Sequence, residues 1–126
     1  MKYTFRISGE TPAKKNSRIV LPNGKNIPSK IYHEWHDKAC FEVTAQRARQ
    51  NLMRPIDSKV EMKVHFVHGD NRKRDCDNGL SSICDLLVDC KIISDDNWKI
   101  VSSVQVSNDY DKGNAYCEVE LWEKDE

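Results

Sequence analysis

The sequence of 126 residues lacks long hydrophobic stretches, because no uninterrupted apolar run exceeds three residues. A membrane-spanning helix needs about 20 such residues, so the composition excludes an integral membrane protein. Two charged residues, Lys2 and Arg6, lie where a secretory signal would place its apolar segment, and we therefore expect a cytosolic protein. Internal repeats and low-complexity segments are also absent. This length predicts one domain spanning residues 1–126.

A C-x-x-C pair is absent, and the five cysteines form an odd set: Cys40, Cys76, Cys84, Cys90 and Cys117. This pattern argues against a disulfide framework and predicts reduced, mostly buried thiols. The histidines at 33, 36, 65 and 68 do not complete a Cys/His constellation of the kind that holds zinc. The three tryptophans, at 35, 98 and 122, are interpreted as core or dimer-interface residues.

Net charge is absent as well, since 20 Lys and Arg residues balance 20 Asp and Glu residues. The balance hides an uneven distribution. Residues 1–74 carry 16 basic and 7 acidic side chains, whereas residues 75–126 carry 4 basic and 13 acidic ones. A neutral chain is not expected to coat nucleic acid indiscriminately, but a basic surface beside an acidic site remains compatible with this pattern.

Alternating apolar and polar residues predict four longer strands, over about residues 3–7, 60–66, 99–106 and 115–121. A short hairpin is expected around Pro22-Asn23-Gly24, because Asn-Gly accepts the backbone conformation of a tight turn. The spacing of apolar residues also predicts two helices, one from an N-cap at Ser29 to about Leu52 and one over residues 78–89 capped by Asp77. This order of elements favours an α+β fold with one mixed β-sheet and two main helices.

Chemistry is expected where the charge changes sign, in the hexapeptide Arg72-Lys73-Arg74-Asp75-Cys76-Asp77. In extended backbone, side chains two residues apart share a face, so Asp75 and Asp77 can point into the same space. Two carboxylates so close repel each other unless a proton or cation compensates them. Mg²⁺ prefers oxygen ligands of this kind. A strand–helix–strand unit could bring the Asp95-Asp96 pair to the same place and complete a metal site.

Simpler explanations of these acidic residues stay open at this point. Asp caps helices and fits turns, so Asp77 could be a helix cap and Asp95-Asp96 a solvated loop. A calcium-binding EF-hand loop fails the test of spacing. Counted from Asp75, that loop would need glycine at the sixth position and glutamate at the twelfth, where the chain has Leu80 and Leu86.

The same region resembles the RusA family of Holliday-junction resolvases. The family pattern is a basic run, D-x-D-N, a helix with an internal D-x-L, and a D-D pair that opens a strand. Here these elements are Arg72 to Asn78, Asp85-Leu86-Leu87 and Asp95-Asp96, in the same order and spacing over about 25 residues. The resemblance implies a homodimeric endodeoxyribonuclease that binds a four-way DNA junction and nicks two strands symmetrically, in DNA recombination and repair.

The resemblance also implies a cofactor and roles for individual residues. The cofactor would be Mg²⁺, with Mn²⁺ as a substitute, and the catalytic metal ligands would be Asp75, Asp77 and Asp96. Asp95 and Asp85 would support the site from further out. The partner would be branched DNA, with neither a membrane nor a small-molecule substrate involved.

The chain departs from the family at one position, because the lysine usually found four residues after the D-x-D motif is Ser81 here. A lysine there would stabilise negative charge developing on the phosphate. Either another cation replaces it, with Lys73, Lys91 and Lys99 as candidates, or catalysis is weakened or lost. A branched-DNA-binding protein without nuclease activity therefore remains an alternative, as does a small module whose acidic half docks a basic partner.

Basic residues on both sides of the acidic pair are predicted to bind DNA. Such contacts would grip phosphates beside the cut and would position the DNA without reading its sequence. The alternative for any one of them is ordinary solvated charge. The predicted DNA-binding residues are Lys14, Lys15, Arg18, Arg72, Lys73 and Arg74.

Overall fold

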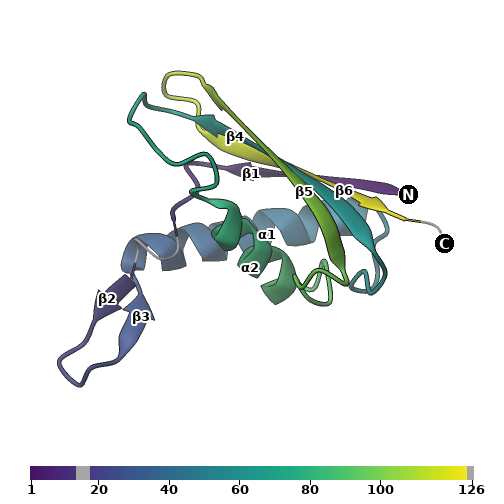
Figure 1. Cartoon of the computed structure of the whole chain (residues 1–126), viewed down its shortest axis with the longest axis horizontal. Helices are drawn as coiled ribbons and strands as arrows, with labels where there is room; N and C mark the ends of the chain where they lie inside the picture. The colour runs from purple at the N-terminus through teal and green to yellow at the C-terminus, as the bar shows by residue number, and fades with distance from the viewer. Residues whose placement is uncertain (14–17, 125–126) are drawn as a thin grey trace.

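A computed structural model describes residues 1–13 and 18–124 and confirms the predicted α+β class with two helices and one mixed four-stranded sheet. Both helices lie on the same face of this sheet, and a separate two-stranded hairpin projects beyond the N-terminal end of α1 (Figure 1). Neither helix in the described ranges is long and apolar enough to cross a membrane. The elements are β1 (Lys2–Ser8), β2 (Arg18–Val20), β3 (Asn26–Pro28), α1 (Lys30–Arg49), β4 (Val60–His68), α2 (Leu80–Asp89), β5 (Val101–Tyr110) and β6 (Tyr116–Glu123).

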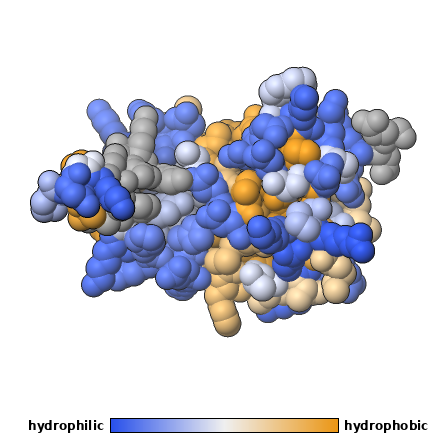
Figure 2. Space-filling model, turned by 90° about the horizontal axis from the view of Figure 1, so that it is seen from below, coloured by the Kyte–Doolittle hydropathy of each residue, from blue (hydrophilic) through white to orange (hydrophobic). Residues whose placement is uncertain are grey.

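The sheet has the strand order β1-β6-β4-β5, in which β4 and β5 run parallel and the other pairs run antiparallel. The parallel pair requires a crossover, which α2 provides. Residues that alternate along β1, β4 and β6 point toward the helices and form one buried core with them, as the predicted alternation requires. From the helical side, apolar residues reach the surface in the middle of the molecule, whereas the end with the hairpin is hydrophilic (Figure 2).

The first helix begins as predicted, because the Ser29 side chain accepts a hydrogen bond from the Tyr32 backbone N–H at 3.3 Å. Further along, α1 protects the β1 edge of the sheet with polar side chains. The Gln46 and Gln50 amides each bond both backbone groups of one β1 residue, Arg6 and Thr4 respectively, at 2.6 to 2.8 Å. The side chains therefore act as a substitute for a neighbouring strand, and this edge is closed to further pairing.

The second helix does not begin as predicted. The N-cap residue is Gly79, which has no side-chain capping bond, and Asp77 contributes only its backbone carbonyl to the Leu80 N–H. The predicted Asp77 cap is therefore wrong, and the Asp77 carboxylate does not cap the helix. The buried face of α2 carries Ile83, Leu86 and Leu87. Burial of these side chains, rather than a side-chain cap, stabilises the helix.

One further expectation is corrected by the structure. Cys40 in α1 and Cys90 at the C-terminal end of α2 form a disulfide, with Cα atoms 5.9 Å apart, so only the remaining three cysteines are free. Their separation by 50 residues gave no local signal for this pair. Of the tryptophans interpreted as core or dimer-interface residues, Trp35 is buried in the core, whereas Trp98 is 76% exposed and stays a candidate for an interface.

Candidate active site

The candidate site is built on the loop that connects β4 to α2. After β4 ends at His68, the chain forms two successive turns, in which the Asn78 N–H donates to the Asp75 carbonyl and the Leu80 N–H to the Asp77 carbonyl, both at 3.0 Å. The turns hold Asp75 and Asp77 at the N-terminal end of α2 with exposed side chains. This end of a helix carries partial positive charge, which favours carboxylates and bound anions.

The structure brings the three predicted ligands to one cavity of about 340 Å³, here called the acidic cavity. Asp75 and Asp77 reach it from the loop, and Asp96 reaches it from the turn before β5. Ser81, the position of the family lysine, also lines it. The complete lining is Asp75, Asp77, Asn78, Leu80, Ser81, Cys84 and Asp96.

The turn before β5 shows how Asp96 is positioned. The Asp95 carboxylate accepts the backbone N–H of Asp96 at 2.7 Å and the Asn97 side-chain amide at 2.9 Å. These hydrogen bonds lower the pKa of Asp95, and the bond from the Asp96 N–H has the largest effect. The pKa of Asp96 is raised instead, chiefly by partial burial and then by its neighbour Asp95, with a smaller contribution from Asp85. Asp95 thus shapes the turn, and Asp96 carries its negative charge in a less favourable environment.

Cys84 of α2 also lines the acidic cavity. Burial raises the pKa of the Cys84 thiol to about 11, with additional contributions from Asp96 and Asp85. Cys84 is therefore a neutral thiol at physiological pH, and it contributes no thiolate to this cavity. In the described ranges, 1–13 and 18–124, no group of three or more His, Cys, Asp or Glu side chains is arranged to hold a metal ion.

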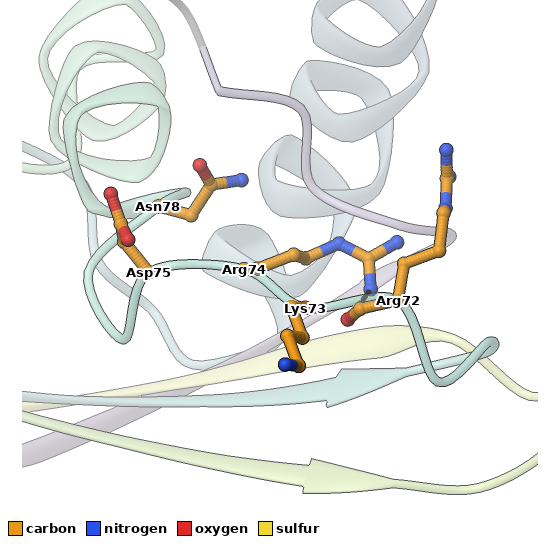
Figure 3. A pocket seen from close by; sticks show the side chains of 5 residues that line it. All are labelled: Arg72, Lys73, Arg74, Asp75 and Asn78. Carbon is orange, nitrogen blue, oxygen red and sulfur yellow. Dashed lines mark hydrogen bonds between the residues drawn. The ribbon is translucent and has the colours of Figure 1, made fainter.

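A second cavity, of about 450 Å³, lies against the first and is here called the basic cavity. Its lining residues are Arg72, Lys73, Arg74, Asp75 and Asn78. Asp75 and Asn78 line both cavities, so the two share a wall. In Figure 3, Asp75 and Asn78 lie at one end of this cavity and Arg72 at the other, while Lys73 extends from the loop toward the sheet.

The two arginines of the basic cavity are already partly neutralised. Asp70 lies 3.3 Å from the Arg72 guanidinium and 3.0 Å from that of Arg74. The Arg72 backbone and side-chain bonds, followed by those of Arg74, lower the pKa of Asp70 to about 2. Arg74 also lies 3.5 Å from Glu10, and its side chain is only 12% exposed. Arg74 therefore braces the loop, whereas Arg72 and Lys73 present exposed side chains.

The remaining predicted DNA-binding residues are Lys14, Lys15 and Arg18. Lys14 and Lys15 lie outside the described residues, and Arg18 is the first residue of β2.

Sequence reasoning missed Asn78 as a site residue, although it lines both cavities. Its position directly after Asp77 in the D-x-D-N pattern was the signal that could have identified it.

Gly79 fixes the loop by close packing. A Cβ atom at this position would lie 2.8 Å from Thr11 Cγ2 and 2.9 Å from Phe66 Cε1, which is closer than carbon atoms pack. We expect Gly79→Ala to lower the free energy of unfolding by about 1–3 kcal/mol, as overpacked core positions do. Urea denaturation measures the change. Ser81→Ala, an exposed position two residues further along α2, is the control and should alter stability by less than about 0.5 kcal/mol. Equal stabilities of the two variants would contradict the close packing.

The chain is similar to known proteins over most of its length. The profile of the family described as Endodeoxyribonuclease RusA matches residues 9–121. Crossover junction endodeoxyribonuclease RusA from Aquifex aeolicus (strain VF5) is 26% identical over 104 residues, which cover 81% of this chain and 77% of that protein. The match includes both loops that supply the acidic cavity, and the chain belongs to the RusA family of endodeoxyribonucleases.

Proposed function

We propose that this endodeoxyribonuclease is Mg²⁺-dependent and resolves four-way DNA junctions by paired symmetric nicks, in DNA recombination and repair. The observation that carries the proposal is the shared wall of the two cavities. Asp75 and Asn78 line both, so a phosphate held by the basic cavity would lie directly beside the three carboxylates of the acidic one. The relative from Aquifex aeolicus, which is named a crossover junction endodeoxyribonuclease, supports the choice of substrate.

The donor set of the acidic cavity fits a hard divalent cation. Asp75, Asp77 and Asp96 offer carboxylate oxygens, and Asn78 offers an amide oxygen. The carboxylates of Asp75 and Asp77 are exposed on a loop and can turn toward a cation that relieves their repulsion. When bound, Mg²⁺ supplies positive charge to the scissile phosphate and makes a water molecule more acidic. Mn²⁺ has similar ligand preferences and is expected to substitute.

The basic residues and the α2 end would bind the DNA backbone. Arg72 and Lys73 are exposed and can contact the phosphates that flank the cut. Lys14, Lys15 and Arg18 are proposed to extend the contact along one arm of the junction. The N-terminal end of α2, which carries Leu80 and Ser81 into the acidic cavity, would favour a phosphate there through its partial positive charge.

A labelled synthetic four-way junction tests the proposed function. We expect paired nicks at symmetric positions in Mg²⁺, no cleavage in EDTA, and recovery on addition of Mn²⁺. A linear duplex of the same sequence is the control and should remain largely intact. Cleavage that persists in EDTA would contradict metal dependence, and equal cleavage of the duplex would contradict selectivity for junctions.

A junction-binding protein without cleavage remains the second candidate, and one observation favours it. Ser81 lines the acidic cavity at the position where the family usually has a lysine, and a serine hydroxyl cannot supply a positive charge there. Junction binding at low salt without nicks in either Mg²⁺ or Mn²⁺ would support this candidate over the nuclease. Absence of binding would contradict both.

Symmetric nicking of two strands requires two sites, and we propose a homodimer that pairs through β5. The two edges of the sheet differ: α1 side chains close the β1 edge, while no strand covers β5 in the described part of the chain. Within its ten residues β5 has no Pro, Lys or Arg, which are common protections of an edge. Antiparallel pairing with the β5 of a second copy would satisfy its outward backbone groups.

The proposed interface predicts the effect of charge on β5. The chain should have a mass in solution of twice its 14.6 kDa, measured by light scattering during gel filtration. Gln105→Lys places like charges near each other across a two-fold axis at the middle of β5, and should shift the protein to monomers. Thr4→Lys, on the closed β1 edge, is the control and should leave the dimer intact. A Gln105→Lys protein that stays dimeric would contradict this interface.

A further inference from the structure

A chain of hydrogen bonds connects the sheet to the middle of the D-x-D motif. The Asn108 side chain in β5 donates its Nδ2 to the backbone carbonyl of Cys76 at 2.8 Å. Its Oδ1 lies 2.8 Å from Nε2 of His68, the last residue of β4. The other ring nitrogen of His68 lies 2.7 Å from the Glu10 carboxylate. Cys76 is the residue between Asp75 and Asp77, so this series of hydrogen bonds ends between two proposed metal ligands.

The chemistry of the donors and acceptors fixes the direction of this chain. A carbonyl only accepts, so Asn108 must present its amide nitrogen to Cys76 and its oxygen to His68. His68 Nε2 then has to carry a proton. The Glu10 carboxylate lies 2.7 Å from Nδ1, on the opposite side of the ring, and holds the ring in this orientation. Reversal of the Asn108 amide would place two oxygens against each other at Cys76.

Glu10, at the other end of this series of hydrogen bonds, is anchored at several points. Glu10 accepts the backbone N–H of Gly69 at 3.3 Å and lies 3.5 Å from the Arg74 guanidinium. Arg74 is in turn held by Asp70 at 3.0 Å. The loop is thus attached at its start through Gly69 and at Cys76 through Asn108. Both attachments lead to the ends of the neighbouring parallel strands β4 and β5.

We propose that Asn108 and His68 are positioning residues that hold the Cys76 carbonyl and thereby set the separation of Asp75 and Asp77 for metal binding. This inference rests on the proposed metal-dependent function. Neither residue lines the acidic cavity, so both act through the backbone between the two carboxylates. Because the carboxylates are exposed on a loop, their preorganisation depends on such a backbone anchor.

Two substitutions of Asn108 separate its hydrogen bond from its shape. Asn108→Asp has nearly the same shape and still accepts from His68, but it places an oxygen against the Cys76 carbonyl. Asn108→Ala removes both bonds. The control is Asn114→Asp, an exposed residue of the β5–β6 turn that undergoes the same change of charge and bonds only Asp111, at 2.9 Å.

Two measurements decide the inference. Hydrogen exchange of the Asn78 and Leu80 amides, which close the loop turns, reports the order of the loop without metal or DNA. Mn²⁺ titration followed by electron paramagnetic resonance reports metal affinity without catalysis. In both Asn108 variants we expect faster exchange and about tenfold weaker Mn²⁺ binding, the usual effect of removing a group that orients a ligand. The Asn114→Asp protein should match the parent in both.

Unchanged exchange and Mn²⁺ affinity in the Asn108 variants would overturn the inference. So would an equal weakening of Mn²⁺ binding in Asn114→Asp, because a substitution that leaves the bond to the Cys76 carbonyl intact would then have the same effect. Failure of the proposed function is distinguishable: a parent chain that neither binds Mn²⁺ nor nicks junctions would overturn that function. Loop exchange would still show whether Asn108 holds Cys76.

Discussion

Asp75→Asn should reduce junction cleavage by about 10³-fold while junction binding without divalent metal stays equal or becomes tighter. A metal ion contributes several kcal/mol to stabilisation of the transition state, and each 1.4 kcal/mol corresponds to about tenfold in rate. Asp75 lines both cavities, so its carboxylate lies where the metal and the phosphate would meet. Removal of one negative charge next to a bound phosphate also favours DNA binding. Single-turnover cleavage and a gel-shift assay in EDTA measure the two effects.

Asp70→Asn is the matched control, because it makes the same change in the same loop. Asp70 lines neither cavity and pairs with Arg72 and Arg74 instead. We expect its cleavage rate to stay within about tenfold of the parent, and its DNA affinity to rise as the two arginines lose a competing carboxylate. Equal loss of cleavage in both variants would indicate that charge on the loop, rather than a specific ligand at Asp75, is what matters.

The parts of the fold that could be predicted are those governed by short-range patterns. Alternation along β1, β4 and β6 reports burial on one face of a sheet, and Ser29 bonds a backbone group only three residues away. The grouping of Asp75, Asp77 and Asp96 was also within reach, because a strand–helix–strand unit returns the chain to a known place. The structure places all three at one cavity, and their catalytic roles remain a prediction.

The parts that could not be predicted depend on contacts between residues distant in the sequence. Gly79 rather than Asp77 is the N-cap residue of α2, and the close approach of Thr11 and Phe66 to Gly79 involves residues that are distant in the sequence. The Cys40–Cys90 pair depends on how α1 lies against α2, which no periodicity specifies. The Asn108 bond to Cys76 joins residues 32 positions apart, and nothing in the local sequence of β5 distinguishes it from an ordinary exposed asparagine.

The change of charge at residue 74 acquires a structural meaning from the two cavities. The basic run and the carboxylates lie on opposite sides of a wall formed by Asp75 and Asn78, so the sequence boundary is also a boundary in space. Asp70 limits the basic side by pairing with both arginines. Among the described residues, no carboxylate forms a salt bridge with Lys73, the third cation of that cavity. Lys73 is therefore the candidate to replace the family lysine.

This assignment predicts opposite effects for two substitutions. Ser81→Lys would place an ammonium group in the acidic cavity and should raise the cleavage rate by about tenfold. Lys73→Ala should lower it by about 10²-fold, the usual effect of losing one group that stabilises developing negative charge. If both positions supply the same charge, the double variant Lys73→Ala/Ser81→Lys should regain most of the parent rate. Single-turnover kinetics on the four-way junction measure all three.

The control for these variants is Lys91→Ala, because Lys91 follows the opposite end of α2 from Ser81 and should leave the rate unchanged. A rate in Lys73→Ala equal to that of the parent would exclude Lys73 as the replacement and would turn attention to Lys99, in the turn that carries Asp96. A Ser81→Lys protein that gains cleavage from a parent without any would instead identify the present chain as a junction-binding protein. In that case Ser81 would mark the loss of the catalytic cation from a cavity that keeps its three carboxylates.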